Sequence, residues 1–196
     1  SPTWDSLRAS GPSGQRFNSV SSPLYLSRDS DYVIPVFKSC FIRPGTSCAG
    51  DKLGEANLSG ANLSDMDFTG ANLQRARLVG ATLNNTNFTD AFLKGAVFSG
   101  ATGANTQLGA RSLADANFSR VRLENPKATG TSFLRSNWTK AYVEKGDFSS
   151  SNFYKSNFEG ASIKNTDMRA TKLRGTSWKG VTVSGSDFKG AVGNKP

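Results

Sequence analysis

Large apolar residues recur at every fifth position from Leu53 to Phe188, and only Gly103 and Ala128 break the series. Two positions before most of them, in 22 of the 28 units, lies Ala, Ser, Thr or Gly, and the other three places of the unit are mostly polar. On an α-helix a step of five rotates by roughly 140°, which would scatter the apolar side chains around the helix. On a strand an odd step sends successive members to opposite faces. The period therefore predicts neither element in its regular form.

A chain that turns a corner every five residues accommodates the period. Each side of a square then holds one small and one large residue inward, and four sides make a coil of about twenty residues whose backbone pairs with the next coil at about 4.8 Å. Residues 51–190 hold 28 such units. The sequence therefore predicts an all-β solenoid of about seven coils, with its large side chains stacked inside in columns.

The repeat carries a family resemblance. The runs Ala56-Asn57-Leu58-Ser59-Gly60 and Ala61-Asn62-Leu63-Ser64-Asp65 resemble the pentapeptide-repeat family, and the resemblance covers residues 51–190. It implies a right-handed quadrilateral β-helix with a sealed, ligand-free interior. It also implies a binding or scaffold role without catalysis, in a family common in cyanobacteria and plant plastids.

The segments on either side of the repeat have different compositions. We expect an irregular leader over residues 1–30, an N-terminal cap over 31–50 and a C-terminal tail over 191–196. In the cap, the β-prone run Tyr32–Phe37 is expected to cover the first coil, because an open solenoid end is an unpaired edge. No comparable cap follows the repeat, so a partner or a second copy is expected to cover the last coil.

Two cysteines, Cys40 and Cys48, flank a turn signal at Arg43-Pro44-Gly45. A disulfide between them is the favoured interpretation, and a reduced pair is the alternative. A disulfide would indicate an oxidising compartment.

Three residues disturb the regular pattern. Arg111 and Pro126 occupy small inward positions, and Gly103 occupies a large one. Because an unpaired buried guanidinium is too costly to keep, we expect a bulge or outward loop between Thr102 and Ser112.

The amino-acid composition excludes most kinds of catalytic and metal-binding site. The chain has no His and only two Cys, so no catalytic, cofactor-binding or metal-binding residue is assigned. Asp147, Asp167 and Asp187 lie at coil spacing, which allows a cation site. Bonding of these short side chains to the backbone of tight turns explains them better.

Charge is distributed unevenly around the predicted rod. The chain has 24 Lys and Arg against 15 Asp and Glu, a net charge of +9. The side centred on Leu53, with its equivalents every twenty residues, carries most of the excess, and some apolar side chains point outward there. Apolar anchors within a basic rim are typical of a docking surface. The predicted protein-binding residues are Phe92, Leu134, Arg135, Tyr154, Lys155, Lys172 and Arg174.

These observations favour a non-enzymatic docking subunit that binds other proteins through the outer faces and ends of the solenoid. The concrete hypothesis is an accessory subunit of a membrane-associated photosynthetic complex in the thylakoid lumen, with an acidic protein surface or an anionic membrane face as its partner. The start Ser1-Pro2 without Met suggests a processed chain. Alternative locations are mitochondrial or bacterial. The alternative function is nucleic-acid association or interaction with gyrase, although the net positive charge has the wrong sign for mimicry of DNA.

Overall fold

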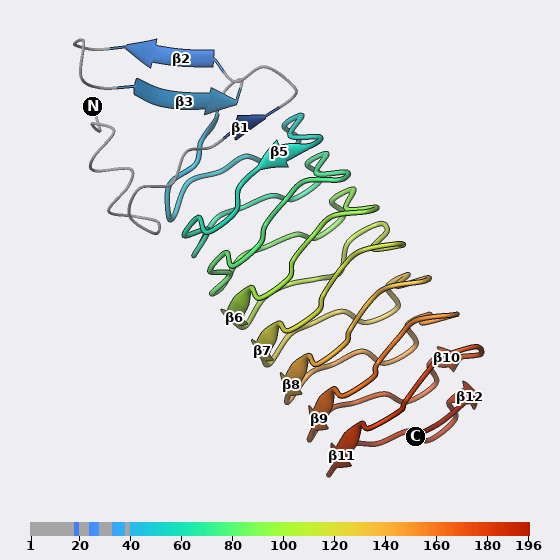
Figure 1. The fold of residues 1–196 in the computed structure, drawn as a ribbon. Helices are drawn as coiled ribbons and strands as arrows, with labels where there is room; N and C mark the ends of the chain where they lie inside the picture. Colours follow the sequence, from blue (N-terminus) through green and yellow to red (C-terminus); the bar gives the residue numbers. More distant parts are fainter. Residues whose placement is uncertain (1–17, 20–23, 28–32, 38–39) are drawn as a thin grey trace.

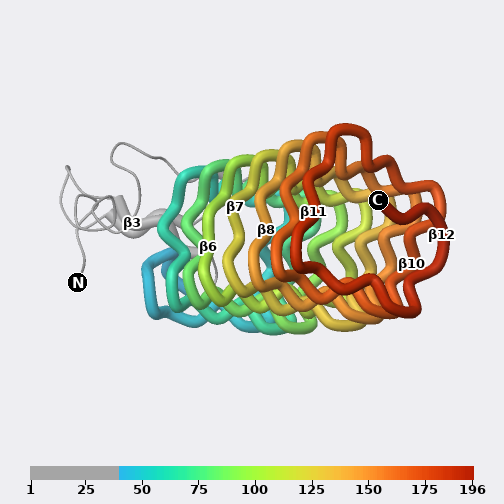
Figure 2. Tube along the Cα trace, turned by 90° about the horizontal axis from the view of Figure 1, so that it is seen from below, coloured from blue at the N-terminus to red at the C-terminus, as the bar shows by residue number. Residues whose placement is uncertain are grey.

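The computed structural model describes residues 18–19, 24–27, 33–37 and 40–196. The structure is all-β, and the repeat winds into a rod of stacked coils (Figures 1 and 2). No helix in the described ranges has the length and apolar character that a bilayer-spanning segment requires. The predicted fold class, a pentapeptide-repeat β-helix, is confirmed.

Parallel pairing at a spacing of twenty residues connects the coils. One side of the rod forms a five-stranded parallel sheet (Figure 1). In the order in which they pair, its strands are β6 (Thr102–Ala104), β7 (Arg122–Glu124), β8 (Tyr142–Glu144), β9 (Ser162–Lys164) and β11 (Thr182–Ser184). Elsewhere most pairing consists of single bridges, which run on one side from Ser47 to Asp187. Corners every five residues leave little straight chain, so much of the pairing between coils is too short to count as a strand. The longest sheet therefore has five strands, slightly fewer than the seven coils expected.

The remaining strands lie near the two ends of the described chain. At the C-terminal end β10 (Lys172–Leu173) pairs in parallel with β12 (Val192–Gly193). At the N-terminal end β2 (Leu24–Ser27), β3 (Val33–Phe37) and β4 (Cys40–Phe41) form an antiparallel sheet, and β1 (Asn18–Ser19) pairs antiparallel with β5 (Ala56–Asn57) of the first coil.

This N-terminal arrangement differs in detail from the expectation. β1 and β2 lie within residues 1–30, which were expected to be irregular. β1 pairs with the first coil, whereas β3, from the run expected to cover it, pairs with β2 and β4. Tyr32 of the expected cap, and the residues of the leader outside β1 and β2, lie outside the described residues. Cys40 and Cys48 form a disulfide that joins β4 to the start of the solenoid.

All but one of the corners of the coils contain a residue of left-handed backbone. From Gly45 to Gly190 every fifth residue has a positive φ, with Ala110 as the exception. Many of these residues are Gly, but Arg75 (φ 55°) and Lys155 (φ 55°) adopt the same conformation. Because left-handed backbone disfavours side chains with a Cβ, the coil-to-coil hydrogen bonds must stabilise these non-glycine corners.

The interior is filled by the five-step series. Aromatic rings stack face to face along one column, with centroid distances of 4.7 Å for Phe98 and Phe118, 4.3 Å for Phe118 and Trp138, and 4.3 Å for Phe158 and Trp178. The rings of Phe98, Phe118, Trp138 and Phe158 are almost completely buried, and Trp178 in the last coil is partly buried.

The structure corrects the expected bulge between Thr102 and Ser112. Thr102–Ala104 is the regular strand β6, and the deviation is confined to the corner at residues 109–111. Ala110 takes the small inward place, its N–H donating to the carbonyl of Leu108 at 2.7 Å, and Arg111 is exposed. A shift of one residue at this corner therefore keeps the guanidinium in solvent without extruding a loop.

The other two irregular residues are accommodated inside the coil. A Cβ on Gly103 would lie 2.5 Å from Thr106 Oγ1, so the Thr106 hydroxyl, which donates to the carbonyl of Leu83, occupies the vacated space. Pro126 is buried, and its ring lies beside Gly146 of the next coil. Thr106 thus compensates for the missing side chain at Gly103, and Gly146 leaves room for the ring of Pro126.

Candidate protein-binding surface

The basic face is the side of the rod whose inward residues are Leu53, Leu73, Leu93, Leu113, Phe133, Phe153 and Leu173, all of which are buried. Parallel bridges hold its outward residues in register, linking Lys52 to Asn72, Asn72 to Phe92, and Asn152 to Lys172. The backbone therefore fixes the spacing of the charges on this face.

Two arginines of the basic face are paired with its two carboxylates. Arg75 binds Glu55 with an N···O distance of 2.6 Å, and Arg135 binds both oxygens of Asp115 at 2.7 and 3.0 Å. The hydrogen bond from Arg135 lowers the pKa of the Asp115 carboxyl. Arg135, one of the predicted protein-binding residues, is therefore already engaged within the chain.

The other predicted residues, apart from Phe92, lie close to one another. Leu134 and Tyr154 are half-buried neighbours in adjacent coils, where the N–H of Arg135 donates to the Tyr154 carbonyl at 2.8 Å. The ammonium of Lys155 lies 5.3 Å from the centroid of the Tyr154 ring. Arg174, exposed, belongs to the next coil, where the N–H of Lys155 donates to its carbonyl. Lys172, also exposed, is bridged to Asn152.

Phe92 lies apart from that group. It is 39% exposed and two coils before Leu134, a separation of about 10 Å along the rod. The guanidinium of Arg111 lies 5.2 Å from the centroid of its ring. Arg111, placed inward by the sequence pattern, thus adds a cation to the basic face and partly covers Phe92.

Several cations of the basic face have no acidic partner. Within residues 40–196 no ion pair involves Lys52, Lys94, Arg111, Lys155, Lys172 or Arg174. Their charges are open to solvent and to a ligand of opposite charge.

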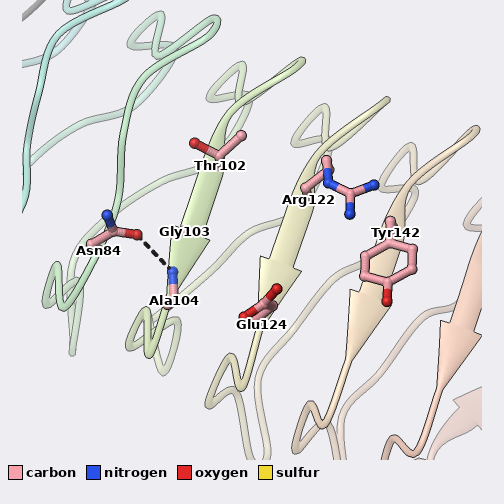
Figure 3. Close-up of a pocket in the computed structure, with 7 residues that line it drawn as sticks. All are labelled: Asn84, Thr102, Gly103, Ala104, Arg122, Glu124 and Tyr142. Atoms are coloured by element: carbon pink, nitrogen blue, oxygen red, sulfur yellow. Dashed lines mark hydrogen bonds between the residues drawn. The ribbon is translucent and has the colours of Figure 1, made fainter.

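The sequence pattern missed a groove on the sheet side. A hollow of about 220 Å³ lies over β6 and is lined by residues of four successive coils (Figure 3). Its lining consists of Asn84, Thr102, Gly103, Ala104, Arg122, Glu124 and Tyr142. The available signal in the sequence was the small residue Ala104 at an outward position where the neighbouring coils carry Asn84 and Glu124.

The described residues give no support to a metal site. Among the described residues the only cluster with suitable spacing is Cys40, Cys48 and Asp51, and both sulfurs belong to the disulfide. In the acidic column, Asp147 accepts hydrogen bonds from Ser149, and Asp167 pairs with Arg169 at 2.6 Å. Each of these carboxylates also accepts the backbone N–H two residues ahead, as the turn interpretation predicts.

A protein-family model named "Pentapeptide repeats" matches the chain in eight copies, over residues 52–85, 116–153 and 139–169. No curated protein sequence matches the chain.

Solved structures with similarity to the chain include HetL and a thylakoid-lumen protein, both described as pentapeptide repeat proteins, and QnrB1. HetL, involved in heterocyst differentiation regulation in the cyanobacterium Nostoc sp. strain PCC 7120, is 23% identical, with 76% of this chain and 75% of that chain covered and a TM-score of 0.32. QnrB1, a plasmid-mediated fluoroquinolone resistance protein, is 16% identical, with 78% and 93% covered and a TM-score of 0.41. A protein from the Arabidopsis thaliana thylakoid lumen is 24% identical, with 64% and 67% covered and a TM-score of 0.29. Scores this low locate no binding site on the present chain.

The five-residue period, the left-handed corner at the end of almost every unit and the match to the repeat model agree with one another. The chain belongs to the pentapeptide-repeat family.

Proposed function

We propose that this protein is a non-enzymatic docking protein that binds an acidic surface of another protein through its basic face. The observation that carries the proposal is the cluster of Leu134 and Tyr154 beside the unpaired cations Lys155, Lys172 and Arg174. An apolar centre surrounded by charge is the usual anatomy of a protein interface.

The architecture supports this assignment. In the coils before the last one the large side chains pack against one another with little or no exposure, so a ligand meets these coils from outside. The interior columns and coil-to-coil hydrogen bonds hold the outer residues in place. A preorganised surface loses little conformational entropy on binding.

We infer that the partner belongs to a larger membrane-associated assembly, and the specific proposal is an accessory subunit of a photosynthetic complex in the thylakoid lumen. The disulfide between Cys40 and Cys48 supports an oxidising compartment. The resemblance of the repeat to a family common in plastids and cyanobacteria supports the photosynthetic setting.

The test uses the free cations rather than Arg135, whose replacement would also leave Asp115 unpaired. The double variant Lys155→Glu with Arg174→Glu and the full chain are each used as bait on mildly solubilised thylakoid membranes, and bound proteins are identified by mass spectrometry. We expect the unmodified chain to retain a defined set of subunits and the double variant to lose them, because repulsion from an acidic partner replaces attraction.

Lys140→Glu is the control. Lys140 is an exposed corner residue on the neighbouring side of the rod, and its substitution also reverses a positive charge. Capture that survives in the double variant, or that is lost equally in the control, contradicts docking through the basic face. Retention by anionic vesicles alone would assign the face to a membrane surface. A salt-sensitive electrophoretic shift with nucleic acid would favour the alternative function.

A further inference from the structure

The groove over β6 has a floor of small residues between taller walls. Gly103 and Ala104 form the floor with Thr102, and Asn84 stands in the preceding coil, its Oδ1 accepting the N–H of Ala104 at 2.9 Å (Figure 3). At the position equivalent to Ala104, the neighbouring coils carry Asn84 and Glu124. The groove therefore exists because one rung of the sheet lacks a long side chain.

One wall carries an ordered guanidinium. The Cζ atom of Arg122 lies 4.4 Å from the centroid of the Tyr142 ring, and the Tyr142 hydroxyl donates to Glu144 Oε2 at 2.6 Å. Lys164 Nζ lies 5.4 Å from the same centroid. In the described residues the Arg122 side chain has neither a carboxylate partner nor a hydrogen bond, so its planar set of donors is available to a ligand carboxylate.

The same wall carries an uncompensated carboxylate two residues further along β7. Glu124 is exposed and has no ion pair among residues 40–196. Its neighbour in the next coil is Glu144, in parallel register, and its neighbour in the preceding coil is Ala104. Two like charges on adjacent strands repel, so a cation bound at Glu124 would relieve this repulsion.

The groove extends along the strand direction. A second hollow of about 470 Å³ shares Ala104 and Glu124 with the first and continues over Asn105 toward the corner at Asn125 and Lys145. From Thr102 to the corner at Asn105 the combined floor is about 10 Å long, which corresponds to three steps of extended chain.

We propose that the groove over β6 binds an extended segment of a partner protein that carries an acidic and a basic side chain two residues apart. The acidic side chain pairs with Arg122 and the basic one with Glu124, because residues i and i+2 of an extended segment lie on one face at the same spacing as Arg122 and Glu124. This inference rests on the protein-binding role proposed above, but it uses a separate side of the rod.

The probe is a synthetic capped peptide with the sequence Gly-Ser-Asp-Ser-Lys-Ser-Gly, added to the isotopically labelled full chain at low ionic strength. We expect amide chemical-shift changes confined to β6, β7 and the adjoining corner, and a control peptide with Asn and Gln in place of Asp and Lys should cause none. Raising the salt concentration to about 0.3 M should weaken binding, since the pairs are exposed.

Ala104→Gln tests the groove itself, because it fills the floor with a side chain of a length that the same column holds elsewhere as Glu124 and Glu144. It should reduce peptide affinity about tenfold, as should Arg122→Gln, which removes a charge-assisted pair. Arg120→Gln, an exposed corner residue outside the groove, is the control and should bind normally.

Equal shifts with the neutral peptide, or unchanged affinity in the Ala104→Gln variant, would overturn the proposal. The absence of any shift at millimolar peptide would also overturn it. The variant Lys155→Glu with Arg174→Glu should leave peptide binding intact, so the groove and the basic face are tested separately.

Discussion

At the scale of single residues, the repeat depends on short polar side chains that serve the backbone. Asn137 is typical, because its Oδ1 accepts the N–H and the hydroxyl of Thr139 two residues ahead. Asn57, Asn87 and Asp147 make the same backbone bond in other coils. This bond shapes the approach to each left-handed corner, so Asn and Asp before the central residue have a structural function rather than a catalytic one.

Asp167 provides a pH test of such a residue. Its side chain accepts hydrogen bonds from the Arg169 guanidinium at 2.9 and 2.6 Å, and this pairing, together with the backbone N–H of Arg169, lowers the Asp167 pKa despite partial burial. A lowered folded-state pKa means that the carboxylate contributes stability above its unfolded pKa of about 3.9 and loses it as the pH falls through the folded value.

NMR titration of the carboxyl carbon should therefore place the Asp167 pKa below its ordinary value, and Arg169→Gln should raise it. The variant should also begin to lose stability at a higher pH than the unmodified protein. An Asp167 pKa that does not respond to the substitution would contradict this account.

At the scale of elements, the interior columns hold the coils together. Phe158 stacks on Trp178 at 4.3 Å and lies at 6.0 Å from Trp138, with nearly parallel rings in both pairs. The equivalent places in the first coils are Leu58 and Leu78, so the column accepts either an aromatic or an aliphatic side chain. Its requirement is a large apolar group, and shape is secondary.

Phe158→Asp should prevent the coils around residue 158 from folding, because a buried carboxylate has no partner there. Phe158→Leu should fold and cost about 1 to 3 kcal/mol through lost packing. Urea unfolding followed by circular dichroism measures both. Wild-type stability in the Asp variant would mean that the ring does not lie in the core.

At the scale of the whole molecule, a solenoid is a row of neighbours, and each coil contacts only the next. The basic face and the groove over β6 should therefore bind their ligands independently. The basic face depends on ion pairs and free cations on one side, and the groove depends on a rung of small residues in the parallel sheet. A change in one should leave the other in place.

The disulfide offers a test of this one-dimensional behaviour. Replacing Cys40 and Cys48 by Ser opens a short loop, and the entropy of loop closure predicts a loss of about 2 to 3 kcal/mol. Hydrogen exchange should accelerate in the cap and first coils, while amides of the central coils, such as Phe118 and Trp138, keep their protection. Uniform acceleration along the rod would show instead that the solenoid unfolds as a single unit.

Much of this architecture follows from the order of the amino acids alone. A five-residue period of large apolar residues is incompatible with a regular helix or strand, so the all-β coil and its buried series from Leu53 onward are consequences of local chain geometry. The sorting of charge onto one side follows from the same arithmetic, because residues twenty apart stack in columns.

Other features were decided only by the folded chain, since they depend on contacts between coils. The sequence does not show that Ala110 replaces Arg111 at the inward place, that Arg135 is bound to Asp115, or that Thr106 fills the space left at Gly103. The groove over β6 is likewise a difference in height between adjacent rungs. A period read along the chain specifies which residues lie one above another, whereas the packing between them determines which charges and hollows remain open.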